Sequence, residues 1–350
     1  MMMSRLLTFV LLLTATAGAL ASDLDWRDDP PLSGLMTPAS TQPHLLYFTA
    51  DWCGPCRLLE REVFANADGQ AELDHFDLVR LDLDSDRGRA MADSFRVTTV
   101  PTFVMLAADG LEIDRIRGYR SRRLLIHDLS RFRVGDGTLG DLQRRLEQSP
   151  GDPTLEAALG LRYLERMEMF EAQVHLARGM VDPSVLPDTL AAEAGRALAD
   201  VYRRQGDAAA GAAVLEKLLR SAPDHAYPRV SWQMLARCRH EMGDAEGEVA
   251  AMREAAYLEP IRAESLALYA RAAADQTLDL EQAEVAAREA VAMTEKQDAG
   301  SMAALAQVLR RREEFSEAML WIKRAVAAAP GEERWVGEKD EVFRAAVWGD

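Results

Sequence analysis

The chain has 350 residues, of which 48% are hydrophobic and 28% are charged. A chain of this length and composition can bury a sizeable core and is too long for one average domain, so we expect two domains. Its 57 acidic and 41 basic residues give a formal net charge of −16 at pH 7. This balance argues against nucleic acid and against an anionic membrane surface as partners, because both are bound through a basic face.

The first 21 residues predict a cleaved export signal. Arg5 is the only charged residue before an apolar run, and the segment ends on the small-residue pattern Ala19-Leu20-Ala21. An uncleaved membrane anchor is the alternative, but the run falls short of the roughly 20 apolar residues that a span needs. We expect an exported protein, periplasmic or otherwise extracytoplasmic, with no stable membrane span after processing.

The next part of the chain predicts an α/β domain over residues 44–134. Residues 22–43 before it are rich in Pro, Asp, Ser and Thr, so we expect a lead-in segment or a short extra element there. Apolar and aromatic runs predict strands at 45–50, 78–83, 102–107 and 111–117, with helices at 57–64, at 87–95 and after Ser121. Parallel strands linked by helices and followed by an antiparallel hairpin predict a mixed sheet covered by helices on both faces.

A different pattern begins after a predicted linker at 135–152. The chain becomes rich in Ala, Leu, Glu and Arg without any strand pattern, and its turns recur at a fixed interval. Gly206-Asp207 returns 37 residues later as Gly243-Asp244, and the prolines Pro223 and Pro260 have the same spacing. Such periodicity predicts helix–turn–helix repeats over 153–331, with a capping helix at 332–350.

These units resemble the tetratricopeptide repeat, whose pattern combines an aromatic residue, Leu-Gly or Leu-Ala, Tyr, Ala and Pro. About five units match, through Leu159-Gly160-x-x-Tyr163, Leu198-Ala199-x-x-Tyr202, Trp232-x-x-Leu235-Ala236, Tyr269-Ala270 and Leu305-Ala306. The resemblance implies an all-α solenoid that binds a protein partner and has no chemistry of its own.

Two cysteines account for the chemistry that the sequence predicts. Cys53 and Cys56 form a Cys-x-x-Cys pair where a predicted strand gives way to a predicted helix. The first sulfur of such a pair faces unpaired amides and the positive end of the helix dipole, which stabilise its thiolate. We therefore expect Cys53 to be an exposed nucleophile and Cys56, one turn further inside, to be the resolving thiol. Pro55 in the first turn costs no hydrogen bond and stiffens the loop.

Other uses of the cysteines are weaker hypotheses. Half of a zinc site is the alternative for the Cys-x-x-Cys pair, but the sequence has no second pair, and we expect neither a metal nor another cofactor. Cys238 lies between Arg237 and Arg239 in a predicted helix. We expect it to be a small packing residue, with a regulatory thiol as the alternative.

The motif Trp52-Cys53-Gly54-Pro55-Cys56-Arg57 after a buried strand, with Val100-Pro101-Thr102 before another, resembles the thioredoxin family over roughly residues 40–133. The resemblance implies a thioredoxin-like fold and a redox-active disulfide between Cys53 and Cys56. It also implies a cis peptide bond before Pro101, next to a backbone that pairs with the substrate like an added strand. The implied substrate-binding residues are Trp52, Gly54, Pro55, Val100 and Pro101.

One position departs from the family pattern. Thioredoxins commonly have a buried carboxylate six residues before the nucleophile, which accepts the proton of the resolving cysteine, and here that residue is Tyr47. The route of this proton is therefore left open. The stretch from Glu60 to Val79 is longer than in small thioredoxins and resembles the domains of exported reductant-relay proteins.

We predict a thiol–disulfide oxidoreductase that exchanges the Cys53–Cys56 dithiol and disulfide with cysteines of protein substrates. The reducing or isomerising direction is favoured, which in an oxidising compartment requires an electron donor. A net disulfide oxidase would share every catalytic residue. An assembly scaffold or redox-sensing interaction protein, whose first domain binds more than it catalyses, is the alternative from another class. The intact cysteine pair together with Pro101 favours catalysis, because a binding module needs neither thiol.

Overall fold

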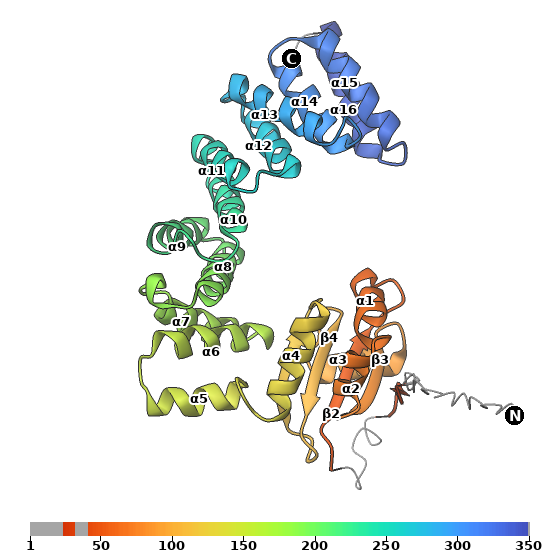
Figure 1. The fold of residues 1–350 in the computed structure, drawn as a ribbon, viewed down its shortest axis with the longest axis vertical. Helices are drawn as coiled ribbons and strands as arrows, with labels where there is room; N and C mark the ends of the chain where they lie inside the picture. Colours follow the sequence, from red (N-terminus) through yellow and green to blue (C-terminus); the bar gives the residue numbers. More distant parts are fainter. Residues whose placement is uncertain (1–23, 32–40, 349–350) are drawn as a thin grey trace, which may run out of the picture. The chain divides into compact units, whose positions relative to one another are not determined.

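The computed structural model describes residues 24–31 and 41–348, so the predicted export signal lies outside the described residues. The chain divides into two compact units, Met1–Thr138 and Leu139–Asp350 (Figure 1). Within the described ranges, none of the helices combines the length and the apolar character needed to cross a membrane.

The first unit is built on a five-stranded mixed sheet with the strand order β1-β3-β2-β4-β5. Strand β2 pairs in parallel with β3 and antiparallel with β4, which in turn pairs antiparallel with β5. The mixed sheet predicted from the sequence is confirmed. The strands are β1 (Arg27–Asp28), β2 (His44–Thr49), β3 (Asp77–Asp82), β4 (Thr102–Leu106) and β5 (Glu112–Arg117).

Helices cover both faces of this sheet. They are α1 (Gly54–Leu59), the π-helix η2 (Glu60–Phe64), α2 (Ala67–Leu73), α3 (Asp86–Ser94) and α4 (Arg122–Arg133). Successive side chains of β2 point to opposite faces, as the pleat requires. Leu45 and Tyr47 join the apolar cluster shared with α1, α2 and α4, whereas Leu46 and Phe48 join the cluster shared with α3. These two clusters form the core of the first unit.

The segment before β2 contributes a short extra element, one of the two alternatives expected for residues 22–43. Strand β1 pairs in parallel with β3, where Arg27 lies opposite Val79. The Trp26 ring beside it packs on Tyr47 and Phe64, with ring centroids 5.7 and 5.2 Å apart. The segment therefore covers the aromatic core next to the end of α1 and η2.

In the described part of the second unit, one helix precedes five antiparallel helix pairs, and one more helix follows them (Figure 1). The pairs are α6 (Pro153–Glu165) with α7 (Met169–Gly179), α8 (Asp188–Arg204) with α9 (Ala208–Ser221), α10 (Pro228–Glu241) with α11 (Ala245–Tyr257), α12 (Ala263–Gln276) with α13 (Leu280–Met293), and α14 (Ala299–Arg311) with α15 (Phe315–Ala328). A 3-10 turn, η3 (Pro183–Val185), precedes α8, and α16 (Glu333–Trp348) follows the last pair. The tetratricopeptide-type repeats predicted from the sequence are confirmed.

Residues 135–152, expected to be a linker, contain the helix α5 (Leu139–Gln148). The reason is an apolar spacing within the segment. Leu139, Leu142 and Leu146 fall on one helical face and pack with Leu155 and Leu159 of α6. Helix α5 therefore belongs to the repeat unit, where it covers the first helix pair.

The two helices of the first pair approach closely at Gly160, a residue of the repeat signature. A Cβ atom built on Gly160 would lie 2.7 Å from the backbone nitrogen of Leu176 in α7. We expect Gly160→Val to lower the free energy of unfolding of the repeat unit by about 2–3 kcal/mol, because overpacking forces the helices apart. Chemical denaturation followed by circular dichroism measures the loss. Gly140→Val in α5 is the matched control, since a Cβ atom added there would meet nothing within 4 Å beyond its chain neighbours and its own helix backbone. An equal loss in both variants would contradict the packing argument.

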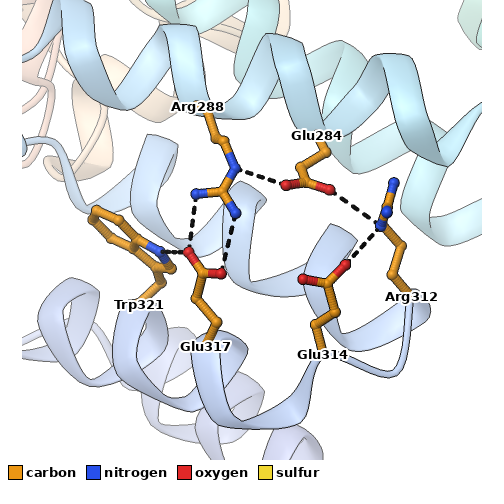
Figure 2. Close-up of polar contacts among 6 residues, drawn as sticks. All are labelled: Glu284, Arg288, Arg312, Glu314, Glu317 and Trp321. Carbon is orange, nitrogen blue, oxygen red and sulfur yellow. Dashed lines mark hydrogen bonds and ion pairs between the residues drawn. The ribbon is translucent and has the colours of Figure 1, made fainter.

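A network of ion pairs connects the last two helix pairs (Figure 2). Arg288 of α13 donates to both oxygens of Glu317 of α15, at 2.9 and 3.1 Å, and to Glu284 at 2.7 Å. The second Glu284 oxygen lies 3.1 Å from Nε of Arg312. Hydrogen bonds from Arg288 and then from Trp321 hold the pKa of Glu317 below its ordinary value.

We expect Glu317→Gln to destabilise the repeat unit by about 0.5 kcal/mol at pH 7, a small effect because the Glu317 side chain is partly exposed. The folded-state pKa of Glu317 lies below its unfolded-state value of about 4.3, so its carboxylate stabilises the fold above that pH. This contribution disappears as the pH falls through the folded-state pKa. Denaturation at pH 7 and pH 3 measures the difference, with exposed Glu254→Gln as the control. A loss that stays constant with pH would show that the ion pair is not its cause.

Candidate active site

The cysteine pair lies at the start of α1, directly after the loop that follows β2. Cys53 is the N-cap residue, and its Sγ accepts a hydrogen bond from the amide of Cys56 at 3.1 Å. The two residues form a disulfide, with Cα atoms 5.3 Å apart. Pro55 occupies the first turn, where the helix needs no amide donor. The strand–turn–helix arrangement thus directs the first sulfur at the amide end of the helix.

The expectation of an exposed Cys53 is wrong for this disulfide form. Cys53 is 3% exposed and Cys56 is 1% exposed. Both belong to the apolar cluster beneath α1, and Val100 packs against that cluster. The expected difference in reactivity between the two sulfurs therefore depends on their positions in α1. Cys53 caps the N-terminal end of this helix, and Cys56 lies within its first turn.

The proposed substrate-binding residues surround this pair. Trp52, Gly54 and Pro55 are exposed, and the peptide bond between Val100 and Pro101 is cis, as the resemblance implied. Pro101 immediately precedes β4, and its carbonyl accepts a hydrogen bond from the amide of Gly118 at 2.8 Å. The disulfide is thus bordered by an exposed turn, while the partly buried Val100 packs against the cysteine cluster.

Asp84 is a residue of this region that the sequence did not reveal. The indole nitrogen of Trp52 donates to the Asp84 carboxylate at 3.2 Å, although 32 positions separate them in the chain. Trp52 itself is 65% exposed, so this bond orients its ring beside the cysteines. No local pattern could have indicated the contact, because it forms only when the turn after β3 lies beside the turn after β2.

Residues 36–131 match the family described as thioredoxin-like domain. A thioredoxin from Mycolicibacterium smegmatis is 33% identical over 93 residues, which span 26% of this chain and 79% of that protein. The chain belongs to the thioredoxin family. This membership rests on its first unit, the thioredoxin domain.

Two further similarities concern proteins with repeats. The TPR repeat-containing thioredoxin TDX of Arabidopsis thaliana is 39% identical over 74 residues, which span 21% of this chain and only 18% of that protein. Among solved structures, YrrB, described as a TPR protein with an unusual peptide-binding site, is 15% identical. The match spans 57% of this chain and 97% of the YrrB chain, with a TM-score of 0.46.

The thioredoxin domain has an aromatic core at the position where the family resemblance implied a buried acid. Tyr47 is fully buried, and its ring stacks on Phe103 with centroids 5.0 Å apart. Its hydroxyl has no hydrogen-bond partner among the described residues. Burial raises the pKa of Tyr47 to about 12. The Tyr47 hydroxyl is therefore protonated at neutral pH and cannot accept the proton of Cys56.

The third cysteine of the chain lies far from this chemistry in sequence, within α10. Cys238 is fully buried, and burial raises the pKa of its thiol. Its sulfur would lie 3.3 Å from a Cβ atom added to Gly211 of α9. Cys238 therefore fills the contact between two helices, as its expected packing role requires.

The repeat unit has a hollow of about 670 Å³ between α5, α6 and α7. Glu156, which is 5% exposed, lies there with its carboxylate 2.6 Å from Nδ1 of His175 and 3.7 Å from Arg178. The Tyr163 ring stacks on His175, with centroids 5.3 Å apart. Charged and aromatic groups therefore share one hollow in the repeat unit.

Proposed function

We propose that this protein is an exported thiol–disulfide oxidoreductase that reduces or isomerises disulfides of protein substrates. The observation that carries the proposal is the Cys53–Cys56 disulfide at the start of α1, bordered by exposed Trp52 and Pro55. The pattern of the first 21 residues supports export. In an oxidising compartment the enzyme would be reduced again by an electron donor.

The catalytic steps follow from the placement of the two sulfurs. In the dithiol form, the amides of α1 stabilise the Cys53 thiolate, which attacks a substrate disulfide and expels one substrate thiolate. The resulting mixed disulfide joins Cys53 to the other substrate sulfur. The Cys56 thiol then loses its proton and attacks Cys53, which forms the intramolecular disulfide and releases the second substrate thiolate. The substrate disulfide gains two electrons, and the cysteine pair loses them.

The repeats are proposed to recruit the protein partner. Stacked helix pairs of this kind present extended binding surfaces, and the hollow around Glu156 and His175 offers a polar position on one of them. The Arabidopsis relative carries both kinds of domain in its name, which supports a working combination of the two. A tethered binding surface raises the local concentration of substrate cysteines near Cys53.

Two measurements on the full chain test this function. We expect the protein to accelerate the reduction of insulin by dithiothreitol, and the variant with both Cys53→Ser and Cys56→Ser to show only the background rate. Equilibration with glutathione gives the potential of the pair, which should be clearly more reducing than the glutathione couple. No acceleration would favour a scaffold or redox sensor, and an oxidising potential would favour a net oxidase.

A further inference from the structure

The last helix of the described chain, α16, is held in place by a tryptophan and a carboxylate. Trp335 is 1% exposed and belongs to an apolar cluster that includes residues of α12, α13, α14 and α15. Glu338 accepts a hydrogen bond at 2.7 Å from Arg271 of α12, whose guanidinium carbon also lies 4.9 Å from the Trp335 ring centroid. Helix α16 therefore extends beyond the last helix pair, beside which it lies, and contacts the pair before it (Figure 1).

The surface that α16 contacts continues past this helix. A hollow of about 490 Å³ is lined by Arg271 and Leu268 of α12 together with Trp335. A second hollow, of about 350 Å³, lies between α10, α11 and α12, where it is lined by the exposed Arg237 and again by Leu268. Because Leu268 lines both hollows, they belong to one continuous surface of the repeat unit. Helix α16 thus covers one end of a surface that is open at the other.

Part of the α16 contact is unfavourable. The indole Nε1 of Trp335 and the Oε2 of Glu338 are both buried without a hydrogen-bond partner among the residues that the structure describes. Burial raises the pKa of Glu338, and the charge of Arg271 opposes this effect only in part. A polar atom buried without a partner costs free energy that it regains in water. Both atoms would therefore gain from release of the helix.

The outward face of α16 differs from that of a simple cap. A helix that ends a repeat array is expected to present a polar outer face to water. Val336, Phe343 and Val347 are instead exposed, at a spacing that places them on one side of the helix. Capping alone therefore does not account for this helix, which has apolar residues on both its buried and its exposed side.

We propose that α16 is an internal ligand, which occupies a partner-binding surface on the last two helix pairs and is displaced by a partner helix of the same chemistry. The inference rests on the proposed recruiting role of the repeats and names what they recruit. The partner presents an amphipathic helix with a large aromatic residue and, three residues later, a carboxylate, as in Trp335-x-x-Glu338. Its aromatic ring takes the place of Trp335, and its carboxylate pairs with Arg271.

The test measures binding of a fluorescently labelled synthetic peptide, with the sequence of residues 332–348, to the full chain. Ala345→Asp should release α16, because Ala345 is 3% exposed and the variant places a charge on the buried face of the helix. We expect the peptide to bind this variant at least about tenfold more tightly than the unaltered chain, since an internal ligand lowers the apparent affinity of its competitor. Ala346→Asp, at the neighbouring exposed position, is the matched control and should bind the peptide no better than the unaltered chain.

The pairing with Arg271 is tested in the released chain. Adding Arg271→Gln to Ala345→Asp should weaken peptide binding by at least about threefold, as should a peptide with Glu338→Gln. The two changes together should weaken binding no more than either change alone, because each removes the same contact. Losses that add independently would contradict the proposed seat of the carboxylate.

Three results would overturn the proposal. They are equal binding of the peptide to the unaltered and Ala345→Asp chains, binding to neither chain, and faster amide hydrogen exchange in α12–α15 as well as in α16 of the variant, which would make α16 a structural cap. If circular dichroism shows that Ala345→Asp unfolds the repeats, Glu338→Gln in the chain supports the same comparison, with an expected gain in affinity of about threefold. Insulin reduction should be equal in all these chains. Its absence from the unaltered chain would refute the proposed function without changing the peptide result.

Discussion

Cys53→Ser should reduce disulfide exchange to the uncatalysed rate, whereas Cys56→Ser should stop the reaction at a covalent complex. The asymmetry follows from the helix. Cys53 caps α1, and in the proposed mechanism the helix amides stabilise its thiolate, so we expect Cys53 to begin the reaction. Cys56 lies inside the first turn and acts only after the mixed disulfide has formed. Losing it leaves the substrate attached to Cys53.

Mass spectrometry of each variant after incubation with a disulfide-containing protein measures this outcome. Cys56→Ser should carry one substrate per chain, and Cys53→Ser should carry none. Cys238→Ser is the matched control, because Cys238 is buried in α10 and outside the thioredoxin domain. A stable mixed disulfide on Cys56 in the Cys53→Ser variant would reverse the two roles.

The parts of the fold that depend on local pattern could be predicted from the sequence. The continuous apolar run of β2 predicted a strand buried on both faces, and its alternate side chains enter the two core clusters. The Leu159-Gly160 signature predicted a repeat helix, and the structure places Gly160 against the Leu176 backbone. The Cys-x-x-Cys pair was likewise predicted at a helix start, and the family resemblance implied the disulfide that joins it.

What escaped prediction depends on contacts that are distant in the chain. Strand β1 has only two residues, which become a strand solely because β3 provides their hydrogen bonds. The burial of Cys53 arises from the packed cluster that also contacts Val100, and no property of residues 52–57 encodes it.

Removing the repeats should change which proteins the thioredoxin domain captures while leaving its chemistry intact. A Cys56→Ser chain that ends after Thr138 retains the whole first compact unit and loses the helices from α5 onward. We expect it to trap the protein substrates of the full chain at least about tenfold less, because a tethered binding surface raises effective concentration by large factors. Isolation of the mixed disulfides from both chains, with mass spectrometry of the attached proteins, compares the two sets.

The control for this comparison uses a substrate that is too small to contact the repeats. With both cysteines present, the truncated and full-length chains should reduce oxidised glutathione at equal rates, which also shows that the shorter chain is folded. In the full chain, Arg178→Ala at the rim of the hollow should weaken capture of the same proteins if that hollow receives part of the partner. An identical set of trapped proteins with and without the repeats would separate the two units in function. The repeats would then serve assembly, and recognition of the substrate would reside in Trp52, Val100 and the turn around the disulfide.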